Sequence, residues 1–327
     1  MKVLSWHVHG SYTTSLVQGS HDYLVPVVPD RGPDGRGRAD SWDWPAQARE
    51  VTPEQLAHEE IDVVIVQRPH EVDLVERWTG RRIGTDLPAV YLEHNAPPEH
   101  AVRTRHPVVT DPRLHDVVVA HVTAFNAMAW DCGDARTTVV DHGIPDPGPR
   151  YTGTDASLAV SVNEPVRRWR VAGSDIVLDL ASTVPVSVYG MKSEGLGAIA
   201  EERGLAGLDR SRCHDLSQDA LHDAMARHRA YLHPYRWTSL GLSLIEAMML
   251  GMPVLALSTT QAPEAVPAGA GVVTNDLERL RATARRLLAD PDEARARGAV
   301  ARAHALEHFS LNRFLADWDR ILKEVAP

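Results

Sequence analysis

The sequence contains no long hydrophobic run and very little cysteine. No stretch of about 18 consecutive apolar residues occurs, so we expect no transmembrane segment. Cys132 and Cys213 are the only cysteines, which excludes a disulfide framework and favours a reducing compartment. The opening residues 1–9 are too short and too polar a run to form a signal peptide. Together these absences predict a cytoplasmic protein.

Basic residues are fewer than acidic residues. The chain has 34 lysines and arginines against 44 aspartates and glutamates, which gives a formal net charge of −10. A general nucleic-acid-binding protein has the opposite balance, so nucleic acid is not expected as a partner. The length of 327 residues favours two domains, each large enough to have a core of its own.

Short apolar runs separated by segments of helical length recur along the chain. They predict parallel β-strands joined by crossover helices, which is an α/β fold. The expected strands are residues 2–8, 23–28, 61–66, 89–92, 116–120 and 137–141 in the first half, and 158–162, 184–189, 229–232 and 254–257 in the second. Residues 142–149 hold three prolines and two glycines, so we place the domain boundary within residues 143–158 and end the first domain at residue 150.

The stretch from residue 233 to residue 257 predicts a strand end, a loop, a buried helix and a second strand. Thr238 and Ser239 are residue types that cap helix N-termini, and residues 242–250 are helical in length and composition. Gly251 suits the left-handed position after a helix, and the proline two residues later prevents the helix from continuing. The helix is apolar on nearly every side, which predicts that it is buried.

Two polar residues, Ser243 and Glu246, interrupt this apolar helix and share a face beside its start. A buried carboxylate is costly unless something pairs with it. The helix start offers free backbone N–H groups and a positive dipole end. A nucleotide diphosphate bound there would place its ribose hydroxyls near Glu246. Alternatively, Glu246 pairs with an arginine in the core, and the residues alone leave both readings open.

The same stretch resembles the donor-binding signature of GT-B glycosyltransferases, in particular family 4. That signature reads approximately P-S-x-x-E-G-F-G-L-x-x-L-E-A-M-A-x-G-x-P-V. The chain matches it at Pro234, Gly241, Leu242, Glu246, Ala247, Met248, Gly251, Pro253 and Val254. The family's first glutamate, which lies near the donor sugar, is replaced by Thr238. The family's donor preference is therefore not carried over to this chain.

The resemblance implies an α/β fold of the GT-B type, with two Rossmann-like domains facing across a cleft. It implies an acceptor domain at residues 1–150, a nucleotide-sugar donor domain at 151–305 and a final helix, 306–327, that crosses back to the first domain. It also implies retention of configuration at the anomeric carbon. No metal or other cofactor is expected, because arginines and a helix start can offset the charge of the leaving diphosphate.

The site residues that the resemblance implies lie where strands are expected to end. His94 resembles the family's active-site histidine, although a structural hydrogen-bonding role is the alternative. Arginine suits the donor diphosphate because its guanidinium binds phosphate with two hydrogen bonds. For Arg167 and Arg168, the two arginines that the resemblance places at the diphosphate, the alternative is an exposed run of solvated charge. The implied donor-binding residues are Gly10, Ser11, Arg167, Arg168, Thr238, Ser239, Leu240, Gly241 and Glu246.

Two further patterns lie in the first half of the chain. Trp42 and Trp44 fall in a long loop rich in glycine, proline and charge. Exposed there, they would pack against an acceptor, and otherwise they anchor the loop to the core. His7 and His9 are two residues apart and would share one face of the first expected strand. No third metal ligand is evident near them in the sequence, so no metal site is predicted.

The sequence therefore predicts transfer of a hexose-type sugar from a nucleoside diphosphate sugar. The acceptor is not identified and could be a small molecule, a glycan or a lipid-linked compound. A GT-B-shaped epimerase that acts on the nucleotide sugar is a second reading. A third is a degenerate partner protein that binds nucleotide sugar without catalysis, which the change at Thr238 keeps open.

Overall fold

The computed structural model describes residues 1–40, 42–98 and 100–326. The chain forms two compact units. Unit 1 comprises Met1–Pro145 and Phe309–Pro327, and unit 2 comprises Asp146–His308. The chain leaves unit 1 after Pro145, which lies within the segment 143–158, and the final helix belongs to unit 1.

Unit 1 contains a parallel seven-stranded sheet with the strand order β3-β2-β1-β4-β5-β6-β7. Its order reverses between β1 and β4, and ligand-binding residues of such sheets lie beyond the carboxyl ends of the strands near this point. The strands are β1 (Lys2–Ser5), β2 (Asp22–Pro26), β3 (Ala48–Val51), β4 (Val63–Val66), β5 (Ala89–Glu93), β6 (Val118–His121) and β7 (Thr137–Val139).

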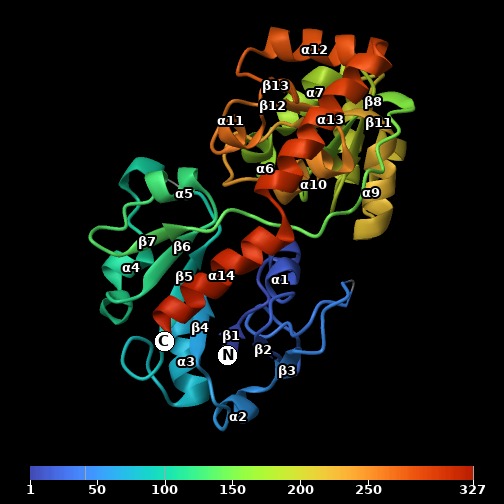
Figure 1. Cartoon of the computed structure of the whole chain (residues 1–327). Helices are drawn as coiled ribbons and strands as arrows, with labels where there is room; N and C mark the ends of the chain where they lie inside the picture. The colour runs from blue at the N-terminus through green and yellow to red at the C-terminus, as the bar shows by residue number, and fades with distance from the viewer. Residues whose placement is uncertain (41, 99, 327) are drawn as a thin grey trace. The chain divides into compact units, whose positions relative to one another are not determined.

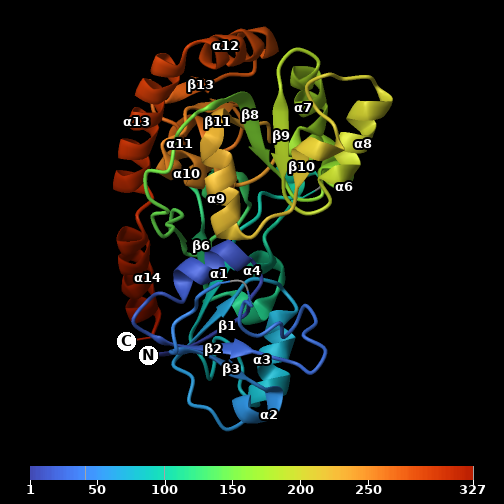
Figure 2. The same ribbon diagram turned by 90° about the vertical axis from the view of Figure 1, so that its right-hand side faces the viewer.

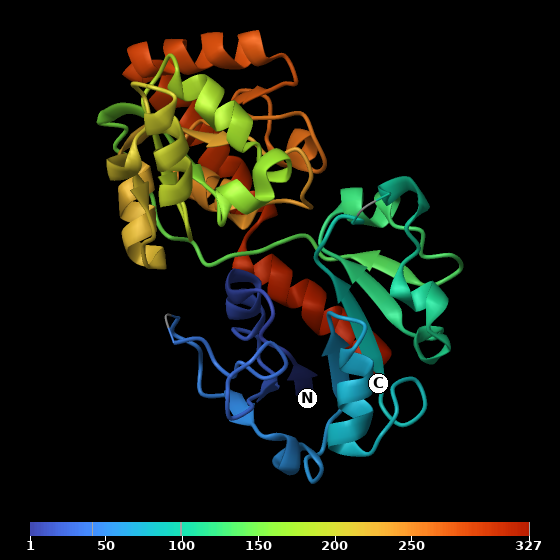
Figure 3. The ribbon, with the colours of Figure 1, turned by 180° about the vertical axis from the view of Figure 1, so that it is seen from behind.

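Helices cover both faces of the unit 1 sheet. The elements are α1 (Gly10–Leu16), α2 (Pro53–Leu56), α3 (Glu71–Thr79), η1 (Ala101–Arg103), α4 (Pro107–Thr110), η2 (Pro112–Leu114), α5 (Ala124–Ala129) and α14 (Leu311–Val325). Helix α14 faces the viewer in Figure 1, whereas α3 faces the viewer in Figure 3. The apolar stripe of α14, formed by Phe314, Trp318 and Ile321, is buried in this unit.

Unit 2 contains a parallel six-stranded sheet with the order β10-β9-β8-β11-β12-β13. This is the strand order of a doubly wound Rossmann sheet, with the reversal between β8 and β11. The strands are β8 (Asp155–Ser161), β9 (Val186–Tyr189), β10 (Cys213–His214), β11 (His228–His233), β12 (Val254–Ala256) and β13 (Gly271–Val273).

The unit 2 helices also divide between the two faces of their sheet. Helix α9 lies in front of β11 in Figure 2 and packs against α10, which in turn packs against α13. Helices α7 and α12 pack on the opposite face. The elements are α6 (Pro165–Ala172), α7 (Ser174–Ala181), α8 (Glu194–Glu202), η3 (Arg210–Arg212), α9 (Gln218–Arg227), α10 (Leu242–Leu250), α11 (Ala262–Ala265), α12 (Leu277–Ala289) and α13 (Pro291–His308).

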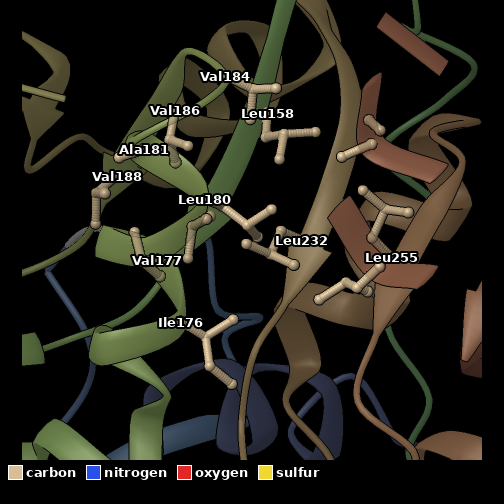
Figure 4. Packing of buried hydrophobic residues seen from close by; sticks show 14 of the residues in the cluster. Leu158, Ile176, Val177, Leu180, Ala181, Val184, Val186, Val188, Leu232 and Leu255 are labelled. Atoms are coloured by element: carbon tan, nitrogen blue, oxygen red, sulfur yellow. The ribbon is translucent and has the colours of Figure 1, made fainter. Parts of the chain in front are cut away.

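Aliphatic side chains from strands and helices fill the core of unit 2. Figure 4 shows Leu158 and Val186 of the sheet packed against Val177 and Leu180 of α7. These four side chains are fully buried. Burying each such side chain stabilises the fold by roughly 1.5–3 kcal/mol. This layer therefore holds the sheet in place, together with the loops that follow its strands.

The α/β prediction is confirmed, and the ten expected strands all occur within a few residues of their predicted bounds. Strands β3, β10 and β13 are not among these ten, and each lies at the edge of its sheet. The expected strand 2–8 ends at Ser5, so His7 and His9 lie in a loop and do not share a strand face. None of the described helices is long and apolar enough to cross a membrane.

Candidate functional site

The loop from β11 to α10 and helix α10 together carry most of the residues that resemble the donor-binding signature. Helix α10 spans Leu242–Leu250 as predicted, and Gly251 has the expected left-handed conformation with φ 94°. The N-cap, however, is Gly241, and no side chain caps the helix. The expectation that Thr238 or Ser239 would cap α10 is therefore wrong, because both lie at least two residues before the helix start. Thr238 is half-buried, whereas Ser239 and Leu240 are buried.

His233 lies directly beneath this uncapped helix start. A Cβ atom on Gly241 would come within 2.8 Å of the His233 Cε1 atom, so the close approach requires glycine. The His233 side chain is 2% exposed, and its Nδ1 atom has no hydrogen-bond partner among the described residues. Burial lowers the pKa of His233 to about 3, so the ring is neutral. In the tautomer that carries its hydrogen on Nδ1, this buried nitrogen would donate to an anion bound at the uncapped helix start.

Sequence reasoning did not select His233. It is the last residue of β11 and immediately precedes Pro234, which begins the matched signature. Its position at the carboxyl end of a central parallel strand is the signal that could have found it.

Glu246 lies one turn inside α10 and is 6% exposed. Its Oε1 atom accepts a hydrogen bond of 2.8 Å from Nε2 of Gln218 on α9. Its Oε2 atom lies 3.7 Å from Nε2 of His222, also on α9. The arginine partner considered for Glu246 is thus replaced by a glutamine and a histidine. Ser243 shares a hydrogen bond of 2.8 Å with Tyr231 of β11, so it braces the helix against the sheet.

The two predicted diphosphate arginines have different surroundings. Arg167 on α6 is exposed and donates to Glu164 at 2.9 Å, and Lys192 also pairs with Glu164 at 3.0 Å. Arg167 therefore already has a carboxylate partner. The guanidinium carbon of Arg168 lies 5.3 Å from the centre of the Tyr235 ring, in that loop. Arg168 thus contacts a residue of the predicted donor-binding loop.

In unit 1, Gly10 and Ser11 are the first two residues of α1 rather than part of a loop. His9 is the N-cap of this short helix, and its side chain does not cap it. A Cβ on Gly10 would make only ordinary contacts, 3.8 Å from Nε2 of His7 and 3.9 Å from Nε1 of Trp42. The space around Gly10 therefore does not demand glycine. Among the described residues, no group of three histidine, cysteine or acidic side chains is placed to hold a metal ion.

His94 directly follows β5, as predicted, and is half-buried. Its ring packs between His9 and Tyr12, with ring centres 4.3 Å and 4.4 Å away. Nε2 of His94 lies 2.9 Å from Oε1 of Gln67, the residue that follows β4. Burial, with smaller effects of His9 and His142, holds the pKa of His94 well below its ordinary value.

The two tryptophans of the long loop differ. Trp44 is 3% exposed and donates from its indole nitrogen to Oγ1 of Thr14 at 2.8 Å. Trp44 therefore anchors the loop to α1, and its proposed role as an exposed acceptor platform is wrong. Trp42 is partly exposed and lies beside Gly10. Its contact with an acceptor stays a prediction.

Two doubly wound parallel units, one with an uncapped helix start after a central strand, define the GT-B class of glycosyltransferase folds. The family model described as glycosyl transferases group 1 matches residues 177–290, all within unit 2. The resemblance to GT-B glycosyltransferases is thereby confirmed, and residues 177–290 of unit 2 are similar to group 1 glycosyl transferases. The narrower assignment to family 4 stays a prediction. No curated protein matched the chain in sequence.

Solved structures support the same fold. A sucrose-phosphate synthase from Thermosynechococcus elongatus is 15% identical, with a TM-score of 0.70 over 99% of this chain and 98% of that one. HepE from Anabaena, solved in complex with UDP-glucose, is 16% identical, with a TM-score of 0.70 over 99% of this chain and 100% of that one. TarM from S. aureus is 13% identical with a TM-score of 0.63, and the match covers 80% of this chain but only 55% of TarM.

Proposed function

We propose that the protein transfers a hexosyl group from a nucleoside diphosphate sugar to a hydroxyl of an acceptor molecule. The observation that carries this proposal is the start of α10, where free amides, Gly241 and the unpartnered His233 meet. The group 1 match over residues 177–290 supports glycosyl transfer. Complexes of the structural neighbour HepE with UDP and with UDP-glucose support a nucleotide sugar as donor.

The diphosphate would bind at the start of α10. Backbone N–H groups and the positive end of the helix dipole favour an anion there, and Arg168 adds a nearby cation. These groups would stabilise the negative charge that develops on the leaving diphosphate. In this proposal the reaction requires no metal ion, because fixed protein groups supply the positive charge.

The ribose would bind at Glu246. An ionised carboxylate offers about four lone-pair positions. Gln218 uses one of these on Oε1. Acceptor capacity therefore remains for the two ribose hydroxyls, and Gln218 would hold the carboxylate in place while they bind.

The acceptor would bind to unit 1, near His94 and Trp42. His94 is held between two rings at a strand end, and Trp42 presents a partly exposed indole. The acceptor is a small molecule, a glycan or a lipid-linked compound that carries a free hydroxyl. The resemblance to the signature of retaining enzymes supports retention at the anomeric carbon.

A thermal-shift screen of UDP, GDP, ADP and dTDP sugars tests the donor, because a ligand that binds only the folded state raises the melting temperature. The expected result is stabilisation by one nucleotide class, followed by sugar transfer when cell-extract acceptors are added. Conversion of the nucleotide sugar to its epimer without acceptor would instead show an epimerase. Tight binding with no turnover would show a partner protein, and no stabilisation by any donor would overturn the proposal.

A further inference from the structure

Three neighbouring strand ends of unit 1 build a short hydrogen-bond chain. Strands β1, β4 and β5 are adjacent in the sheet, and Trp6, Gln67 and His94 follow their carboxyl ends. Nε2 of Gln67 lies 2.7 Å from the carbonyl oxygen of Trp6. Oε1 of Gln67 lies 2.9 Å from Nε2 of His94. Gln67 is 7% exposed, so its amide is held among these partners rather than by water.

The Trp6 carbonyl determines which atoms donate and which accept along these hydrogen bonds. A carbonyl oxygen only accepts hydrogen bonds, so the Gln67 atom facing it must be the amide nitrogen. The amide oxygen of Gln67 then faces His94, and this oxygen also only accepts. Nε2 of His94 must therefore carry a hydrogen. Since the low pKa of His94 keeps the ring neutral, its Nδ1 atom is left with a lone pair.

The surroundings of His94 leave this lone pair unused by the protein. Within residues 1–40, 42–98 and 100–326, no side chain or backbone group donates to Nδ1 of His94. The rings of His9 and Tyr12 contact His94 on its sides and fix its plane. The Tyr12 hydroxyl accepts a hydrogen bond from the Trp318 indole at 3.0 Å, and no hydrogen bond joins it to His94 among the described residues. A hydroxyl that approaches the half-buried ring finds an acceptor nitrogen there.

We propose that Gln67 is a positioning residue, which fixes His94 in the Nε2–H tautomer so that Nδ1 accepts a hydrogen bond from a substrate hydroxyl. His94 would thus receive a hydrogen bond from the bound sugar or acceptor, rather than donate one. The identity of that hydroxyl compound rests on the proposed function, whereas the tautomer itself does not. Two experiments therefore separate the two statements.

The first experiment reads the tautomer without any activity. Long-range ¹H–¹⁵N correlation spectra of the ¹⁵N-labelled full chain distinguish protonated from unprotonated ring nitrogens. The chain has 17 histidines, so the His94 signals are identified by their loss in His94→Gln. We expect protonated Nε2 and unprotonated Nδ1 near pH 7, and a mixture of tautomers in Gln67→Leu. A protonated Nδ1 in the unaltered protein would overturn the proposal.

The second experiment uses kinetics once a donor and an acceptor are known. Gln67→Leu should lower kcat by roughly five- to tenfold, the factor expected for one lost hydrogen bond. A rise in KM for only the donor or only the acceptor would show which compound carries the hydroxyl. The matched control is Gln47→Leu, because Gln47 donates to the Gly19 carbonyl at 3.2 Å and does not contact His94. An equal loss in both variants would refute a specific role of Gln67.

Gln67→Glu keeps an acceptor opposite Nε2 but loses the donor to the Trp6 carbonyl, so a melting curve first checks that this variant folds. Its carboxylate would favour the imidazolium form and raise the pKa of His94. Protonated Nδ1 cannot accept a hydrogen bond, so activity should be lost at a higher pH than in the unaltered protein. An unchanged acid limb of the pH profile, together with an unchanged spectrum of His94, would contradict the proposed coupling.

Discussion

Gln218 on α9 donates a hydrogen bond of 2.8 Å to the carboxylate of Glu246 on α10. This contact joins α10, which carries part of the donor-binding signature, to its neighbour α9. No residue of α9 was predicted to belong to the site. His222 on the same helix lies 3.7 Å from the other oxygen. The carboxylate is thus buried but paired, and it keeps acceptor capacity for a ligand.

Glu246→Ala should weaken donor binding by about ten- to a thousandfold, because one or two hydrogen bonds to a charged group are lost. Glu246→Gln retains one acceptor oxygen and should lose the smaller amount. Calorimetric donor affinity and melting curves of both variants measure this. Gln218→Ala is the control, since it removes the protein partner alone and should lower the melting temperature while the donor still binds. Full affinity in Glu246→Ala would exclude Glu246 from the donor site.

Arg168 and Arg167 form a matched pair of neighbouring arginines. Arg168→Ala should weaken binding of the nucleoside diphosphate by roughly tenfold, because a guanidinium near the diphosphate is lost. Arg167→Ala should leave that affinity within about twofold, because Arg167 is exposed and already paired with Glu164. Titration of the free diphosphate at low and moderate salt measures both variants. Equal losses would show a general effect of charge instead of a specific contact by Arg168.

Trp44 and Trp42 should respond differently to truncation. Trp44→Ala removes a buried ring and its bond to Thr14, so it should destabilise the protein by about 3–5 kcal/mol. Trp42→Ala should change stability by less than about 1 kcal/mol, because the ring is only partly buried. Urea unfolding measures both. If Trp42 contacts the acceptor, its truncation should raise the KM for acceptor, and an unchanged KM would assign it no such role.

Stability should fall as the pH drops from 6.5 toward 4. Burial lowers the pKa of His121 and of His228 to about 4, from an ordinary value of 6.5. Below pH 6.5 the unfolded chain binds protons that the folded chain excludes, so these groups favour unfolding. Each contributes a slope of about 1.4 kcal/mol per pH unit within this window.

Urea unfolding at pH 7, 6 and 5 measures that slope. His228→Gln is the informative variant, because it removes one titrating group whose ring bonds to Ser157 and Tyr189 at 2.7 Å each. It should lower stability at pH 7 and flatten the pH dependence. A free energy of unfolding that does not change between pH 7 and 5 would show that these histidines titrate normally.

The sequence by itself determined the elements that are governed by local rules. The apolar run 242–250 followed by Gly251 gave the bounds of α10, because helix length and a left-handed glycine are encoded within one short segment. The alternation of apolar runs with helical segments gave two parallel α/β units. The edge strands β3 and β10 were missed, because they are short and their pairing depends on distant neighbours.

Only the tertiary structure decided which side chains meet. Glu246 and Gln218 are 28 residues apart, and His94 and Gln67 are 27 apart, so no periodicity along the chain connects them. Trp44 became a core residue because Thr14 offers its indole a partner. Secondary structure is set by nearby residues, whereas partners, burial and tautomers are set by strand order and helix packing, which bring distant positions within hydrogen-bond reach.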